Sequence, residues 1–230
     1  MPLKGLYLLI NLFTISFPLI RSFEHRINYF SKWKYVFIAE GIVMLLFIPW
    51  DIAFTNSGIW GFNPKYLSGV YLFNLPIEEW LFFVTVPFSC IFIYESLKLL
   101  VKFYPGPRAT KIISLFLIGF LLLALGLNTD KAYTSLTFLL VVVFILLGQF
   151  VFRLPFMGRI YWAYLFVLLP FLIVNGVLTG FGIPEQVVWY NSEEFMGFRI
   201  GTIPFEDTFY GFLLIALNIA IYLKLQGRVS

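Results

Sequence analysis

The sequence has few charged residues, one cysteine and one histidine among its 230 positions. Charged residues make up 12% and hydrophobic residues 60%, which leaves too little polar surface to cover a soluble globular protein of this size. Cys90 lies in an apolar segment without a second cysteine, which excludes an intrachain disulfide and a thiolate metal site. His25 lies in a basic loop without partners at metal-ligand spacing, so we predict no metal site.

Signatures of nucleotide-binding, nucleic-acid-binding and exported soluble proteins are also missing. There is no glycine-rich phosphate fingerprint, and we therefore predict no flavin or nicotinamide cofactor. The net charge is +4, but the basic residues lie in short clusters beside apolar runs. This pattern sets membrane topology, so we predict no nucleic-acid partner. The apolar run from Leu6 to Ile20 is followed by Arg21 without a small-residue cleavage site, which favours a retained span over a signal peptide.

Long apolar runs separated by short polar loops predict an all-α integral membrane protein with about seven transmembrane helices. A span of the bilayer needs about 20 residues. The predicted loops on one side hold twelve Lys and Arg residues, and those on the other side hold four. By the positive-inside rule, the N-terminus lies outside the cell membrane and the C-terminus is cytoplasmic. The predicted helices lie near residues 6–22, 35–54, 76–99, 112–128, 134–152, 161–181 and 207–224.

The segment of residues 63–83 resembles the segment of residues 191–211 at a constant offset of 128 positions. This repeat predicts two parallel three-helix units, residues 1–104 and 133–230, joined by a connector helix within residues 105–132. Parallel units are related by an axis along the membrane normal, which brings their acidic motifs to the same non-cytoplasmic face. The identical pairs are Asn63 with Asn191, Gly69 with Gly197, Pro76 with Pro204, and Glu78 with Glu206.

A proline followed by two acids begins the last helix of each predicted unit, at residues 76–79 and 204–207. Proline is tolerated in a first helical turn, where Asn74 or Thr202 could cap the free amides. One interpretation is therefore a capped helix start whose carboxylates only complement the helix dipole. Carboxylates at the edge of the hydrocarbon are costly unless they are neutralised or used. The candidate catalytic residues are therefore Glu78, Glu79, Glu206 and Asp207.

An aromatic residue follows each motif by one helical turn. Glu78 precedes Phe82 by four residues, as Glu206 precedes Tyr210, so each carboxyl shares a helix face with a ring. An acid can protonate an alkene, and an aromatic face can stabilise the resulting cation. The same rings could instead only pack between helices. We expect Glu78 and Glu206 to face a common apolar cavity lined by both rings.

Several neighbouring residues are candidates for supporting roles. Asp51 and Asn56 lie near the outer end of the second predicted helix, and Asn175 lies in the comparable stretch of the second unit. Their side chains either hydrogen-bond the motif carboxyls or anchor loop backbone. Arg199 is the one base near the second motif and could hold its carboxylates ionised. The supporting or cation-stabilising candidates are Phe82, Tyr210, Asp51, Asn56, Asn63, Asn191, Arg199, Trp60 and Trp189.

The two motifs, Pro-Ile-Glu-Glu at 76–79 and Pro-Phe-Glu-Asp at 204–207, resemble those of the membrane-integral lycopene cyclases. In that family, three-helix units occur as separate subunits or fused in tandem, and this chain is similar to the fused form over nearly its whole length. Three of the differences between the two copies leave open whether both copies catalyse. These differences are Asp207 for Glu79, Arg199 for Tyr71, and Thr208 for Trp80.

The resemblance implies conversion of linear lycopene to cyclic β-carotene, without net redox change and without flavin. Lycopene and other hydrophobic carotenoids would be held by apolar and aromatic side chains, to which the 29 phenylalanines could contribute. A neutral carboxyl would protonate the terminal alkene, the nearby double bond would attack the tertiary cation, and a second carboxylate would take a proton. Exclusion of water would prevent capture of the cation as an alcohol.

Two functions of other classes stay open on the sequence alone. A small transporter or proton-linked carrier would also use parallel repeats with acids near a shared axis, although these acids lie at helix ends and not in mid-membrane. A non-catalytic membrane scaffold is the third possibility. The sequence also leaves open the number of lycopene ends cyclised, the ring isomer, the division of acid and base roles, and the oligomeric state.

Overall fold

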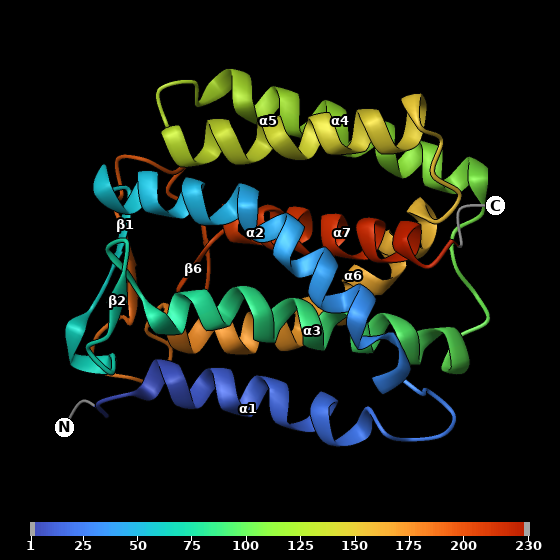
Figure 1. Ribbon diagram of the computed structural model, residues 1–230. Coiled ribbons are helices and arrows are strands. Elements are labelled where there is room, and N and C mark those ends of the chain that lie inside the picture. The colour runs from blue at the N-terminus through green and yellow to red at the C-terminus, as the bar shows by residue number, and fades with distance from the viewer. Residues whose placement is uncertain (1–2, 228–230) are drawn as a thin grey trace.

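The computed structural model describes residues 3–227, which form seven α-helices and three two-stranded sheets (Figure 1). A 3₁₀ turn, Phe30–Lys32, precedes α2, and a π-helical turn, Leu147–Val151, extends α5. The helices are α1 (Leu6–Arg21), α2 (Trp33–Asn56), α3 (Ile77–Leu100), α4 (Pro107–Leu127), α5 (Ala132–Leu146), α6 (Met157–Leu178) and α7 (Glu206–Leu225).

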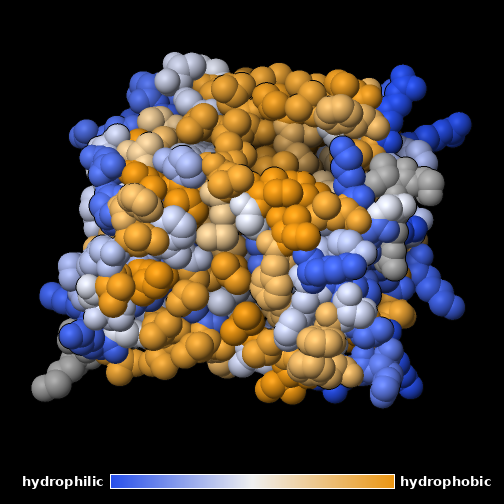
Figure 2. Space-filling model, in the orientation of Figure 1, coloured by the Kyte–Doolittle hydropathy of each residue, from blue (hydrophilic) through white to orange (hydrophobic). Residues whose placement is uncertain are grey.

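Six of the seven helices are long and apolar enough to cross a membrane, and α1, with 16 residues, is shorter. Figure 2 shows hydrophobic side chains across the middle of the molecule and hydrophilic ones gathered at the two ends of the helices. Large apolar side chains such as Phe13 and Leu45 are each 78% exposed, which suits contact with lipid rather than water. The prediction of an all-α integral membrane protein is therefore confirmed.

Helices α3 and α7 lie side by side at the centre of the bundle and run in the same direction (Figure 1). Helix α1 packs on α3, and α5 packs on α7. Helices α2 and α6 each contact both central helices, while α4 lies outside against α5 and α6. Each unit thus contributes an equivalent layer, and the two units are parallel as the repeat predicts.

A pair of antiparallel strands joins the two units at the end of the bundle where α3 and α7 begin. Strand β1 (Trp60–Phe62) pairs with β4 (Val188–Tyr190), with Gly61 opposite Trp189. The flanking hydrogen bonds obey the 128-residue offset, since Asn63 N–H donates to Val187 O (2.8 Å) and Asn191 N–H donates to Ile59 O (2.9 Å). Because each bond maps onto the other by exchange of the units, the repeat is a pseudo-twofold symmetry of the fold.

A short hairpin precedes each central helix. Strands β2 (Tyr71–Leu72) and β3 (Leu75–Pro76) form the first, and β5 (Arg199–Ile200) and β6 (Ile203–Pro204) form the second. Gly69 and Gly197 have φ values of 95° and 82°, a left-handed conformation that glycine adopts without steric cost. The positive φ angle therefore explains why both copies have glycine at this position.

The hairpins correct the predicted helix starts. Pro76 and Pro204 lie in strands β3 and β6, and the helices begin at Ile77 and Glu206, so neither proline occupies a first helical turn. The predicted caps are also wrong, because Asn74 donates to Asn56 Oδ1 and the Thr202 hydroxyl bonds to Thr179 and to Gly176 O. Strand pairing within the hairpins therefore outweighs the local preference of proline for the first turn of a helix.

The close approach of β1 and β4 gives a stability prediction. A Cβ added at Gly61 would lie 2.7 Å from Trp189 Cε2, so Gly61→Ala should destabilise the protein by about 1–3 kcal/mol, a range typical of overpacking. Thermal denaturation in detergent, followed by size-exclusion chromatography, measures the effect. Gly119→Ala, on α4 with open space around its Cβ, is the matched control. Adding Trp189→Ala should restore stability, and an undiminished midpoint for Gly61→Ala alone would contradict this account.

Candidate active site

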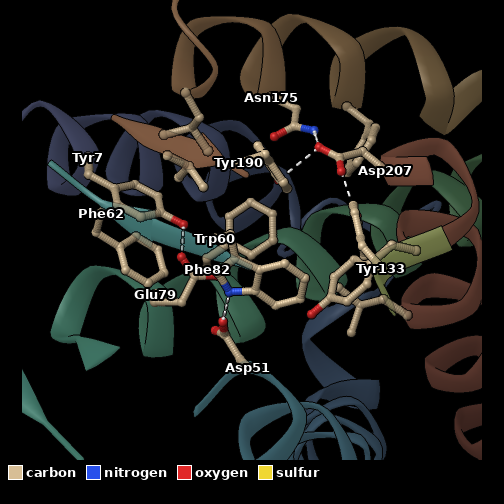
Figure 3. A pocket seen from close by; sticks show the side chains of 15 residues that line it. Tyr7, Asp51, Trp60, Phe62, Glu79, Phe82, Tyr133, Asn175, Tyr190 and Asp207 are labelled. Atoms are coloured by element: carbon tan, nitrogen blue, oxygen red, sulfur yellow. Dashed lines mark hydrogen bonds between the residues drawn. The ribbon is translucent and has the colours of Figure 1, made fainter. Parts of the chain in front are cut away.

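A small cavity of about 50 Å³ lies where the central helices begin, and both units contribute to its wall. Figure 3 shows the carboxyl groups of Asp51, Glu79 and Asp207 at this cavity, among aromatic rings from both units. Among residues 3–227, no lysine, arginine or histidine lines it. The lining residues are Tyr7, Asp51, Trp60, Phe62, Glu79, Phe82, Tyr133, Phe171, Asn175, Leu178, Val188, Tyr190, Asp207, Tyr210 and Leu214.

Asp207 is buried and accepts three hydrogen bonds. The Tyr133 hydroxyl donates to its Oδ1 (2.5 Å), while Asn175 Nδ2 (2.6 Å) and the Tyr190 hydroxyl (2.9 Å) donate to its Oδ2. Burial, together with the nearby Asp207 charge, raises the pKa of Tyr190 well above its usual range, so this phenol stays protonated as a donor. Of the expected partners, Asn175 does hydrogen-bond a motif carboxyl, and both oxygens of Asp207 are engaged.

Glu79 has a smaller set of donors. The Tyr7 hydroxyl donates to its Oε2 at 2.5 Å, and this is the one side-chain donor to Glu79 among the described residues. Asp51 accepts from Trp60 Nε1 at 2.5 Å through Oδ1, while its buried Oδ2 has no hydrogen-bond partner. The first unit therefore holds two carboxyl groups with spare acceptor positions, opposite the fully engaged Asp207.

Glu78 and Glu206 lie outside the cavity lining, unlike the expectation that they would face it. Both are fully buried and accept a backbone N–H of the preceding loop through Oε1: Ser68 donates to Glu78 (2.6 Å) and Met196 to Glu206 (2.8 Å). These bonds are equivalent by the 128-residue offset. Successive residues of a helix point about 100° apart, so only one acid of each motif can face the cavity. The structure places Glu79 and Asp207 there.

Tyr7, Tyr133 and Tyr190 donate to the cavity carboxyls but were not among the residues predicted from the sequence. Tyr7 and Tyr133 occupy the first turns of α1 and α5 and donate to Glu79 and Asp207, respectively. They are 126 residues apart, so a search for tyrosines at nearly the repeat offset would have found them. Tyr190 on β4 carries no such signal, because its approach to Asp207 depends on the pairing of β1 with β4.

The supporting candidates divide between the cavity and its surroundings. Phe82, Tyr210, Trp60 and Asp51 line the cavity. Asn63 and Asn191 instead accept the backbone N–H two residues later, at the ends of β1 and β4. The remaining candidates also lie outside the lining: Asn56 accepts from Asn74, and Trp189 covers Gly61.

Arg199 is a correction. It has no ion pair with Glu206 or Asp207 in the described structure; its Nη1 donates to Thr202 O (2.6 Å), and its guanidinium lies over the Phe195 ring. The side chain of Arg199 bonds within the hairpin formed by β5 and β6. Its separation from the motif along the sequence gave no sign of this. Within the described part of the chain, the second motif therefore has no basic partner.

The cavity can perform acid–base chemistry on an apolar group. Three carboxyl groups supply proton donors and acceptors, and the aromatic walls offer ring faces that can stabilise a cation. Among residues 3–227, no group of three or more His, Cys, Asp and Glu side chains is placed to hold a metal ion.

Comparisons with known proteins bear on this chemistry. The sequence matches the Lycopene cyclase family over residues 4–97 and 130–225, which together cover most of the chain and leave out α4. It is 26% identical, over 212 residues, to the bifunctional lycopene cyclase/phytoene synthase of Aspergillus niger. That match covers 81% of this chain and 33% of the relative, so the chain spans about a third of the relative's length. No solved structure matches the chain.

The loop bonds of Glu78 and Glu206 predict a structural role for both. Replacing either by Ala leaves a partly buried backbone N–H without its acceptor, which should destabilise the protein by roughly 1–3 kcal/mol. Gln keeps an acceptor oxygen and should retain most of the stability. Thermal denaturation of the four single variants in detergent tests this, and Ala variants as stable as their Gln counterparts would exclude the acceptor role.

Proposed function

This chain belongs to the lycopene cyclase family, and from that membership we propose that it closes the end of linear lycopene into a β ring at the cavity of Asp51, Glu79 and Asp207. The observation that carries this proposal is the meeting of carboxyl groups from both units in one aromatic-walled cavity. The reaction is an isomerisation: one proton enters, one leaves, and no redox partner or cofactor is required. The relative's name also includes phytoene synthase, and we do not propose that activity for this chain.

The hydrogen bonds support different roles for the carboxyl groups. Three donors on Asp207 stabilise its carboxylate, which suits a base or a stabiliser of the cation. Glu79 and Asp51 share the cavity without a basic residue, and enclosing like charges together favours retention of a proton. Glu79 is accordingly proposed as the general acid, with Asp51 sharing its proton.

In the proposed reaction, Glu79 transfers its proton to the terminal double bond of lycopene, which leaves a tertiary cation. The π electrons of the neighbouring double bond form the ring C–C bond and move the charge into the ring. Loss of a ring proton to Asp207 regenerates a double bond. The rings of Phe82 and Tyr210 face this cavity and would stabilise the cation, while the small volume limits the number of water molecules that could trap it.

The orientation of the chain in the cell membrane is part of the proposal. The cavity lies at the end of the bundle with the strands, and most Lys and Arg residues lie in the loops at the opposite end. By the positive-inside rule the strand end, and with it the cavity, is placed outside and the C-terminus in the cytoplasm. Lycopene, being a hydrocarbon, would enter from the bilayer.

The carboxyl assignment predicts a specific pattern of activity. Glu79→Gln and Asp207→Asn should each reduce product formation by roughly 10²- to 10⁴-fold, the usual contribution of general acid–base catalysis. Glu78→Gln and Glu206→Gln, which keep their loop acceptors, should retain most of the activity. Pigment from a lycopene-accumulating host, normalised to membrane-inserted protein and compared with β-ring standards, measures this. The reverse pattern would return catalysis to Glu78 and Glu206, and a wild-type chain that leaves lycopene linear would exclude the proposed function.

The orientation predicts opposite labelling of two introduced cysteines. Glu193→Cys should react with a membrane-impermeant maleimide in intact cells, because the side chain is exposed at the strand end, which the proposed orientation puts outside. Lys102→Cys, at the other end, should react only after permeabilisation. The unmodified chain, whose Cys90 is buried, gives the background. If instead Lys102→Cys reacted in intact cells and Glu193→Cys only after permeabilisation, the orientation in the membrane would be the opposite of the proposed one.

A further inference from the structure

An apolar groove of about 360 Å³ lies between α1, α3 and α6, on the side of the bundle that α1 covers. Its lining includes Val86 and Ile93 of α3, Val167 and Phe171 of α6, and Phe17 of α1. The volume falls within the range of small-molecule sites, whereas the 50 Å³ carboxylate cavity holds only a few water molecules. The cavity alone cannot accommodate a substrate, but the groove offers the missing space.

The groove and the cavity share two continuous helix faces. On α3, residues Glu79 and Phe82 line the cavity and Val86 and Ile93 line the groove, at intervals of three, four and seven residues that keep them on one face. On α6, the same succession runs from Leu178 and Asn175 in the cavity to Phe171 and Val167 in the groove. Phe171 lines both spaces, so its ring is the boundary between them.

The position of Phe171 depends on a glycine. A Cβ added at Gly211 of α7 would lie 2.8 Å from Phe171 Cζ, so the absence of a side chain at Gly211 makes room for this ring. The equivalent position of the first unit, 128 residues earlier, is Phe83, which is buried against Phe47 with ring centroids 6.1 Å apart. The side-chain space that Phe83 fills in the first unit is therefore left free by Gly211 in the second unit, and the Phe171 ring lies against it.

The pseudo-twofold symmetry generates a second groove, of about 480 Å³, between α2, α5 and α7. Ile93 of the first groove corresponds to Ile221 of the second, and Ser89 corresponds to Leu217. This second groove shares no lining residue with the carboxylate cavity. The two grooves are therefore similar in size and apolar character but differ in their connection to the acids.

The hydroxyl groups in the first groove are already satisfied. Thr14 donates to Ile10 O, Ser16 to Phe13 O, and Ser89 to Thr85 O, all within their own helices. No carboxyl or basic side chain of the described residues lines the groove. An occupant would meet only apolar surface, which suits a hydrocarbon chain and offers nothing to a polar headgroup.

We infer that the groove between α1, α3 and α6 binds the polyene chain of the substrate, and that its end group enters the carboxylate cavity when the Phe171 ring moves off Gly211. The inference rests on the proposed function for the identity of the polyene. It explains how a 50 Å³ cavity serves a long hydrocarbon: the acids hold only the reacting end, and the groove holds the chain that follows it. The second groove, which shares no lining residue with the carboxylate cavity, takes no part.

Matched tryptophan substitutions test the groove. Ile93→Trp narrows the first groove and Ile221→Trp narrows the second at the symmetry-equivalent position, so the two variants change the same residue type by the same volume. In liposomes, Ile93→Trp should raise the lycopene concentration at half-maximal rate by about tenfold or more, as expected for lost apolar contact in a binding site. Ile221→Trp should match the unsubstituted chain. Equal effects of the two variants, or none from Ile93→Trp, would overturn the inference.

A binding measurement separates this inference from the proposed reaction. Lycopene that co-purifies with the Glu79→Gln protein is measured by its absorbance relative to protein, which needs no turnover. Adding Ile93→Trp should lower this ratio, whereas adding Ile221→Trp should not. A lower phospholipid content with unchanged lycopene would show that the groove holds lipid instead, and would overturn the inference. If the unsubstituted chain forms no cyclic product, the proposed function fails while this ratio still decides the groove.

Two further variants keep the test decisive. Phe171→Trp should block passage into the cavity, so product formation falls while lycopene retention by the groove persists. If Phe171→Trp lowered product formation and lycopene retention together, the polyene would be bound outside this groove. Denaturation midpoints and elution profiles establish that each variant is folded, and the milder pair Ile93→Phe and Ile221→Phe replaces the tryptophan variants if either is not.

Discussion

Asp207 and Glu79 are buried inside a membrane bundle, where an ion deprived of water costs several kcal/mol unless nearby groups compensate it. Much of the surrounding structure provides that compensation. The first turns of α1 and α5 bring Tyr7 and Tyr133 to the two carboxyls, and the end of α6 brings Asn175 to Asp207. Pairing of β1 with β4 closes the cavity and places Tyr190 over it. Helices and strands at this end of the bundle thus contribute the hydrogen-bond donors of the two buried acids.

The duplicated architecture explains how so small a chain assembles this site. A pseudo-twofold axis between α3 and α7 brings the same position of each unit to one cavity, so that each unit supplies an acid and a tyrosine. The copies then differ in what surrounds the acid: Asp207 has three donors, whereas Glu79 has one and shares the cavity with Asp51. The symmetry brings the acids close together, and the departures from symmetry give them different hydrogen-bond environments.

The two acids of each motif have different surroundings, since Glu79 and Asp207 line the cavity and Glu78 and Glu206 do not. Glu78 and Glu206 each tie the loop before the hairpin to the central helix, by equivalent bonds to Ser68 and Met196. The loops they hold carry the hairpins that set the starts of α3 and α7, and so the direction in which Glu79 and Asp207 point. The same asymmetry of neighbours appears at Phe171 and Gly211, where the second unit leaves space that Phe83 fills in the first.

The sequence by itself determined the membrane class, the helices, the parallel duplication and the acidic motifs, because these follow from hydropathy and from spacing along one chain. The matching Asn, Gly, Pro and Glu pairs were sufficient to predict which segments are equivalent. Only the tertiary structure decided which acid of each motif faces the cavity, since Glu78 and Glu79 differ by a rotation of one residue on a helix whose start depends on a hairpin. It also decided the partners of those acids. Tyr190 reaches Asp207, and Arg199 turns away from it, through strand pairings between residues whose contacts no local pattern encodes.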